Sequence, residues 1–94
     1  NVSFLAGPAL DWAVCVCEKT QMAAYTRYST DWAQGGPIIE REKISLEWTG
    51  EDWMAYIRHD EEFFAPTPLI AAMRCFVASK LGEEVDVPDE LITK

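Results

Sequence analysis

The sequence is poor in the residues that carry most catalytic and metal chemistry. It has a single histidine, His59, and three cysteines, of which Cys15 and Cys17 do not have the C-x-x-C spacing of zinc or redox sites. No serine or cysteine stands in a nucleophile motif, and "QGGP" lacks the lysine of a phosphate-binding loop. These absences argue against a hydrolase triad, a zinc site and a P-loop, and we expect neither a metal nor a cofactor.

Positive charge and long apolar runs are also scarce. The chain has 8 basic and 16 acidic residues, which gives a formal net charge of −8. Such a balance repels a phosphate backbone, so we expect no direct binding to nucleic acid. No apolar run approaches the ~18 residues of a membrane span, so we expect a cytoplasmic protein that does not enter the membrane. Three cysteines cannot all pair within one chain, which fits a reducing compartment.

The composition that remains is that of an ordinary globular protein, with 49% hydrophobic and 26% charged residues. The length suffices for one hydrophobic core, so we expect a single domain over residues 1–94. The hydrophobic period changes along the chain from about 3.6 to 2 and back. This change predicts an α+β fold, with two helices packed on a small, mainly antiparallel sheet that contains a central β-hairpin.

Two segments have the pattern of helices. Residues 8–19 follow a Gly-Pro step and repeat apolar residues at helical spacing. Residues 67–81 begin with Thr67-Pro68, a favourable N-cap and first helical residue, and end before Gly82. Apolar residues surround the first helix, and four tryptophans are many for so small a core. We therefore also expect a homo-oligomer, because exposed apolar patches mark interfaces.

The segment 43–58 alternates apolar and polar residues on both sides of a tight turn, which predicts a β-hairpin. Around it the pattern is weaker. "QGGP" indicates a turn, after which Ile38-Ile39 would begin a strand, and residues 23–28 fit a turn or a short strand. The acidic tail from 83 to 90 would add a short edge strand.

The segment "STDWAQGGPIIERE", residues 29–42, is the best candidate for a ligand site. It gathers an aromatic ring with amide, carboxylate and guanidinium groups in a predicted loop, where binding residues tend to lie. A planar anionic ligand needs such groups. The predicted ligand-binding residues are Tyr28, Thr30, Asp31, Trp32, Gln34, Gly35, Gly36 and Arg41. The alternative is that Trp32 fills the core while residues 29–31 only shape a turn.

Two long motifs carry a resemblance to a known group of proteins. They are "YSTDWAQGGPIIEREKISL" and "PTPLIAAMRCFVASKLGEEVDVP", and "GPALDWAV" near the start fits the same group. With these motifs the chain resembles a family of small accessory proteins of unknown function, of the nin-region type, encoded by lambdoid phages and prophages. The resemblance implies a phage setting in a bacterial host cell and an accessory, non-structural role. It implies no catalytic residues.

These observations favour a non-catalytic binding protein that acts against host defences. It would sequester a small polar or nucleotide-like ligand, or block a host protein through its acidic tail and the outer face of the first helix. One alternative is a small enzyme on a nucleotide-type substrate, with Asp31 or Glu40 as acid or base. Another is an acidic DNA mimic. The mimic ranks third because the acidic residues are spread over hairpin, loop and tail rather than set in rows.

Overall fold

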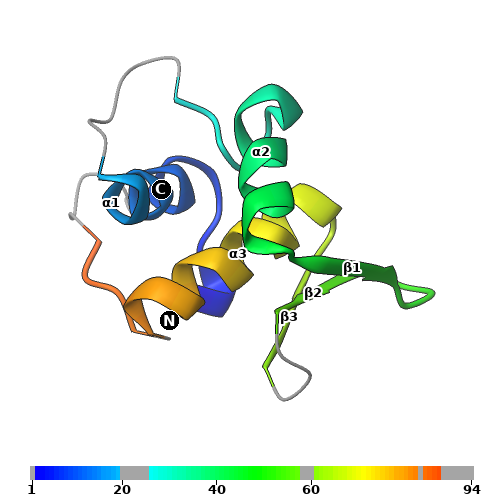
Figure 1. The fold of residues 1–94 in the computed structure, drawn as a ribbon. Helices are drawn as coiled ribbons and strands as arrows, with labels where there is room; N and C mark the ends of the chain where they lie inside the picture. Colours follow the sequence, from blue (N-terminus) through cyan, green and yellow to red (C-terminus); the bar gives the residue numbers. More distant parts are fainter. Residues whose placement is uncertain (1, 20–25, 58–60, 83, 88–94) are drawn as a thin grey trace.

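The computed structural model describes residues 2–19, 26–57, 61–82 and 84–87. They form a short 3-10 helix, three α-helices and three strands (Figure 1). In chain order these are η1 (Val2–Phe4), α1 (Gly7–Glu18), α2 (Trp32–Glu42), β1 (Ser45–Trp48), β2 (Trp53–Tyr56), β3 (Glu62–Ala65) and α3 (Pro68–Leu81). None of the helices in these residues is long and apolar enough to cross a membrane.

The three strands form one antiparallel sheet in the order β1-β2-β3. The predicted hairpin is confirmed: β1 and β2 pair with Leu46 opposite Ala55. The sequence analysis did not predict β3, which pairs with β2 and places Phe63 opposite Ala55. The α+β class and the antiparallel sheet are therefore as predicted, and the sheet is one strand wider than the hairpin.

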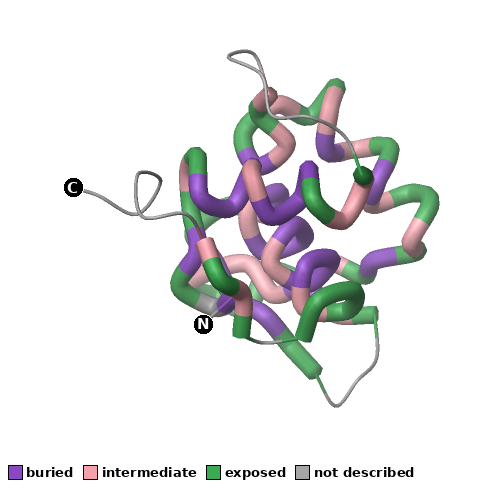
Figure 2. The backbone as a smooth tube through the Cα atoms, turned by 90° about the vertical axis from the view of Figure 1, so that its left-hand side faces the viewer, coloured by how far each residue is buried: buried purple, intermediate pink, exposed green. Residues whose placement is uncertain are grey.

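Helix α3 is the central element of the fold. It packs against all three strands, and it also contacts α1, α2 and η1. Large side chains such as Phe76 and Met73 are buried on it together with small ones such as Ala71 and Ala72. Figure 2 shows the buried backbone segments gathered in the interior of the molecule. Of the two predicted helices, α3 thus covers the sheet, whereas α1 packs against α3.

The predicted ends of these two helices lie within one residue of the observed ones. Thr67 caps α3, because its Oγ1 accepts a hydrogen bond from the Ile70 N–H at 3.2 Å. At the other end of α3, the Gly82 N–H donates a hydrogen bond to the Ala78 carbonyl at 2.9 Å. A proline in the first turn of α1 is in the place that its sequence predicts.

The prediction of a loop over residues 29–42 is wrong from Trp32 onward, where α2 begins. Asp31 is the N-cap of this helix, and its Oδ1 accepts a hydrogen bond from the Ala33 N–H at 2.9 Å. Pro37 lies inside the helix, after a glycine. A glycine has no Cβ to clash with the following proline ring, which lets the chain stay helical there. The predicted strand that would begin at Ile38 is also wrong, because Ile38 and Ile39 lie inside α2.

Gly35 shows what the glycine pair does instead of forming a turn. A Cβ added to Gly35 would lie 2.4 Å from the Tyr28 carbonyl oxygen and 2.6 Å from Cδ1 of Leu69. Helix α2 therefore approaches α3 and the Tyr28 backbone as closely as a glycine allows. A Cβ on Gly36 would meet only the Trp32 ring, at an ordinary contact distance of 3.6 Å.

The other irregular segments were predicted less well. Residues 84–87 form no strand, so the predicted edge strand is absent from this part of the tail. Val85 and Val87 instead pack as partly buried residues against the core. Residues 26–28 are also not in a strand, and the rest of the predicted 23–28 turn lies outside the described residues.

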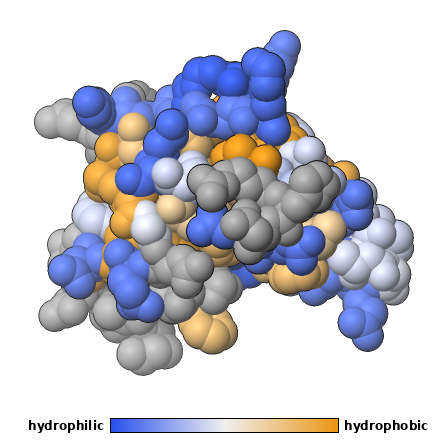
Figure 3. Space-filling view, turned by 60° about the horizontal axis from the view of Figure 1, so that its bottom comes forward, coloured by the Kyte–Doolittle hydropathy of each residue, from blue (hydrophilic) through white to orange (hydrophobic). Residues whose placement is uncertain are grey.

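Large apolar side chains remain exposed at several places. They are Phe4, Val16, Trp32, Trp48, Ile57, Phe64 and Leu81. Figure 3 shows hydrophobic patches on one face of the molecule, separated by hydrophilic side chains. Scattered exposed apolar residues are ordinary in monomers, whereas contiguous ones mark interfaces. The homo-oligomer therefore stays a prediction.

The two neighbouring glycines give a matched test of the helix packing. Gly35→Ala should lower the free energy of unfolding by about 1–3 kcal/mol, because the added methyl overpacks against a backbone carbonyl. Gly36→Ala should change it by less than about 1 kcal/mol, since better helix propensity offsets the crowding before Pro37. Urea denaturation of both variants measures the difference. Equal costs at the two positions would contradict the close approach.

Candidate functional site

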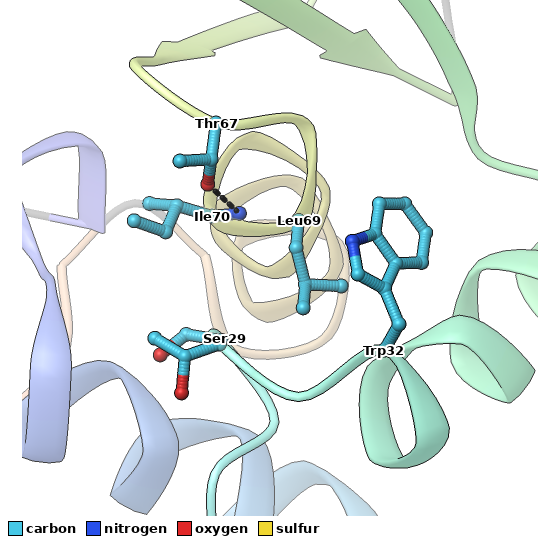
Figure 4. Close-up of a pocket in the computed structure, with 6 residues that line it drawn as sticks. Ser29, Trp32, Thr67, Leu69 and Ile70 are labelled. Carbon is cyan, nitrogen blue, oxygen red and sulfur yellow. Dashed lines mark hydrogen bonds between the residues drawn. The ribbon is translucent and has the colours of Figure 1, made fainter.

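A pocket of about 190 Å³ lies between the start of α2 and the start of α3 (Figure 4). Its wall combines hydroxyl-bearing residues with an indole and two aliphatic side chains. The lining residues are Ser29, Thr30, Trp32, Thr67, Leu69 and Ile70. They come from two segments that are far apart in the sequence, so the pocket exists only because α2 packs on α3.

Two helix starts meet at this pocket. Trp32 is the first residue of α2, after its cap Asp31, and Leu69 and Ile70 belong to the first turn of α3, after its cap Thr67. The first N–H groups of a helix lack intrahelical partners, and the helix dipole places partial positive charge there. Asp31 and Thr67 already accept hydrogen bonds from the Ala33 and Ile70 N–H groups, and Pro68 has no N–H. The partial positive charge of the two helix starts still favours hydrogen-bond acceptor atoms of a ligand.

The Trp32 side chain is 52% exposed. Its indole extends past Leu69 at the edge of the pocket (Figure 4) and lies against Gly36 on its own helix. The interpretation in which Trp32 fills the core is therefore wrong. An indole held by the helix with about half of its surface in solvent presents a face on which a planar group can stack.

The segment beside the pocket is anchored to α1 by a buried hydrogen bond. The Ser29 N–H donates to Oδ1 of Asp11 at 2.8 Å, and both residues are buried. In the described part of the chain, the Ser29 hydroxyl has no hydrogen-bond partner and is itself buried. The sequence analysis missed Asp11. Its signal is an acidic residue in the middle of the apolar run of α1, where a carboxylate needs a partner.

The structure brings Thr30 and Trp32 to the pocket, whereas Asp31 and Gln34 build the helix start. Besides capping α2, Asp31 accepts a hydrogen bond through Oδ2 from the Gln34 Nε2, at 3.2 Å. The Gln34 Oε1 in turn accepts one from the Arg27 N–H at 2.9 Å. These contacts fix the turn before α2, so the two side chains support the pocket without lining it.

Tyr28 and the two glycines have packing contacts. The Tyr28 carbonyl lies against Gly35, and its side chain packs partly buried against the core. Gly35 and Gly36 lie inside α2 rather than in a loop. Of the predicted ligand-binding residues, these three contribute to the approach of the helices and do not line the pocket.

Arg41 lies at the opposite end of α2, about 14 Å along the helix axis from Trp32. Its Nη2 lies 2.5 Å from Glu18 of α1, and its Nε lies 2.8 Å from Glu42. Lys80 of α3 adds a contact of 3.4 Å to Glu42. Hydrogen bonds to the two carboxylates raise the pKa of Arg41, and the bond from Arg41 holds the pKa of Glu42 below its ordinary value. Arg41 thus connects the ends of the helices and does not join the pocket.

Other reactive groups offer little chemistry. Among the described residues, no group of three or more histidine, cysteine or acidic side chains is arranged to hold a metal ion. Burial raises the pKa of the Cys17 thiol to about 11, and burial raises the pKa of the Cys75 thiol to about 11. Both thiols therefore stay protonated at neutral pH, in the unreactive form.

Sequence reasoning missed the α3 half of the pocket. Thr67, Leu69 and Ile70 were recognised only as the beginning of a helix, and Ser29 was in the quoted segment but not among the predicted ligand residues. No local pattern shows that two helix starts lie side by side. The signal that existed was the pair of N-cap residues, each of which marks a helix end with unpaired N–H groups.

The ion pairs of Arg41 should matter to stability and not to the pocket. Because Arg41 is half exposed, we expect Arg41→Ala to lower the free energy of unfolding by only about 0.5–1 kcal/mol at low salt, and by less at 1 M salt.

The same ion pairs should make stability depend on pH. The pKa of Glu42 is lowered on folding, so the contribution of Glu42 to the free energy of unfolding is complete above its unfolded-state pKa of about 4.3. This contribution is lost as the pH falls below that value. Chemical denaturation at several pH and salt values measures both effects. A loss independent of salt would contradict the ion-pair account.

The comparisons with known proteins place the chain in a phage family. Residues 22–80, more than half of the chain, match the family model described as Bacteriophage P22, NinX. The match includes α2, the sheet and nearly all of α3, and therefore every residue that lines the pocket. No curated protein sequence matches the chain. The predicted resemblance to phage accessory proteins is confirmed: the chain belongs to the NinX family of bacteriophage P22.

Proposed function

We propose that this phage accessory protein is a non-catalytic binding protein whose ligand stacks on Trp32, in the pocket between the starts of α2 and α3. The observation that carries the proposal is the half-exposed indole beside the hydroxyl-bearing residues Thr30 and Thr67, where two helix starts converge. Binding sites commonly pair an aromatic wall with a few placed polar groups.

The size of the pocket favours a ring-sized ligand group. Its volume of about 190 Å³ is below the ~300–1,000 Å³ of pockets that enclose a whole drug-sized molecule. A single heteroaromatic ring fits this space, with the rest of the ligand outside. Ring nitrogens and carbonyls match threonine hydroxyls, and a phosphate near either helix start matches its N–H groups. A nucleobase-bearing ligand combines these features.

The phage setting suggests what such binding achieves. A protein that holds a nucleotide signal without converting it lowers the free concentration of that signal in the host cell. The family membership supports an accessory role. In the second version of the proposal, the pocket receives a side chain of a host protein and the complex blocks that protein. The two versions share Trp32 and differ in whether the free ligand is a small molecule.

Trp32→Ala should reduce affinity tenfold to a hundredfold, because it removes a stacking contact of about 1–3 kcal/mol. Trp48→Ala is the matched control, since Trp48 is exposed to a similar degree, 56%, and lies on the hairpin. Isothermal titration of both variants with a panel of linear and cyclic nucleotides measures the effect. Recovery of the bound nucleotide unchanged after long incubation distinguishes sequestration from turnover.

The same variant should leave the fold nearly intact. A half-exposed tryptophan contributes less than a buried one, so we expect Trp32→Ala to cost below about 1.5 kcal/mol rather than the ~3–5 kcal/mol of a core position. A thermal melt of the variant provides this control.

Failure of every nucleotide to bind would overturn the small-ligand proposal. Equal losses of affinity in Trp32→Ala and Trp48→Ala would also overturn it.

A further inference from the structure

The sheet has a second face that is opposite α3. Strand residues alternate between the two faces, and the buried ones, such as Ala55, Phe63 and Ala65, face α3. The six strand residues of the opposite face, which we call the open sheet face, are Ser45, Glu47, Met54, Tyr56, Glu62 and Phe64. None of them is buried, and no helix of the described residues packs broadly on them.

The centre of the open sheet face is apolar and aromatic. Met54 and Phe64 lie directly opposite each other on β2 and β3, and Tyr56 follows Met54 on the same face. Phe64 is 44% exposed. Methionine, phenylalanine and tyrosine are the residue types enriched in the cores of protein interfaces, whereas the outer face of a solvated sheet is normally polar.

Arg74 of α3 connects the N-terminal segment to the backbone of β3. The Arg74 guanidinium donates to the Leu5 carbonyl at 2.8 Å and to the Phe64 carbonyl at 2.6 Å. These two bonds hold the segment beside β3, next to the 82% exposed side chain of Phe4. Partial burial lowers the pKa of Arg74, and in the described part of the chain it forms no ion pair. Arg74 thus joins two backbone segments.

The charge on the open sheet face is negative. Glu47 and Glu62 flank the apolar centre, and none of the six positions is a lysine or arginine. The Tyr56 hydroxyl donates to Glu47 at 3.3 Å, which keeps that carboxylate beside the aromatic ring. The chain as a whole has a net charge of −8. A surface of this kind attracts cationic partners and repels a second copy of itself.

We propose that the open sheet face docks a basic amphipathic helix of a partner protein. Apolar residues of that helix would cover Met54 and Phe64, while its lysines or arginines would meet Glu47 and Glu62. Three strands of four residues span about 13 by 14 Å. Three turns of a helix, about 16 Å long and 10 Å wide, match this area. So small an interface gives a weak or transient complex.

The proposal is tested with a synthetic helical peptide of about 14 residues, with leucine at helical a and d spacing and lysine elsewhere. Methyl and aromatic NMR signals of the full chain report where the peptide binds. We expect the largest shifts at Met54 and Phe64, and a dissociation constant that rises with salt. A peptide with glutamate in place of each lysine should not bind.

Phe64→Ser should weaken binding at least tenfold, and Glu47→Gln should weaken it several-fold at low salt. Trp48→Ser is the matched control, because Trp48 is an exposed aromatic residue on the other face of the sheet, and it should leave affinity unchanged. Shifts centred on the Trp32 pocket, or equal binding of the glutamate peptide, would overturn the proposal. So would a dimer in sedimentation that Phe64→Ser dissociates, because a second copy would then be the occupant. None of these results depends on whether the pocket binds a nucleotide.

Discussion

The contact between Gly35 of α2 and Leu69 of α3 is the constraint on which the candidate site depends. Because position 35 carries no side chain, the α2 backbone lies directly against the Leu69 side chain of α3 and against the Tyr28 carbonyl. This approach brings Trp32 to within reach of Thr67, although the two belong to different helices. The buried hydrogen bond from the Ser29 N–H to Asp11 connects the segment before α2 to α1, and so holds Ser29 and Thr30 beside the pocket. The pocket is thus a consequence of how α2 packs and not of a binding loop.

The sequence predicted the elements whose signals are local. Thr67-Pro68 and the closing Gly82 defined α3, and strict alternation defined the β1–β2 hairpin. It failed at α2, because glycine and proline inside a helix read locally as a turn. An Asp31-x-x-Gln34 pair does resemble a helix start, but the reason for Gly35 is a contact with α3, which no local pattern contains. Tertiary packing outweighed propensity at this position.

The candidate site was predicted only in part, because the sequence was interpreted as a loop where the structure has helix α2. Thr30 and Trp32 line the pocket, while Arg41, grouped with them as a loop neighbour, lies at the other end of a rigid helix. A predicted loop allows distant residues to converge, whereas a helix fixes their separation. The ends of the helices consequently differ in role. The starts of α2 and α3 form an open pocket, and their other ends are closed by the pairs among Glu18, Arg41, Glu42 and Lys80. In the part of the chain that the structure describes, none of the residues that line the pocket is an arginine or lysine.

The four tryptophan indole N–H signals of the full chain test most directly whether Trp32 is the stacking surface of the pocket. In a nucleotide titration followed by ¹H–¹⁵N NMR, the account predicts that the Trp32 indole signal shifts with saturation. The signals of Trp12, Trp48 and Trp53 should stay nearly in place. Equal shifts of all four signals, or a shift confined to Trp48 and Trp53 on the hairpin, would contradict the assignment of the site.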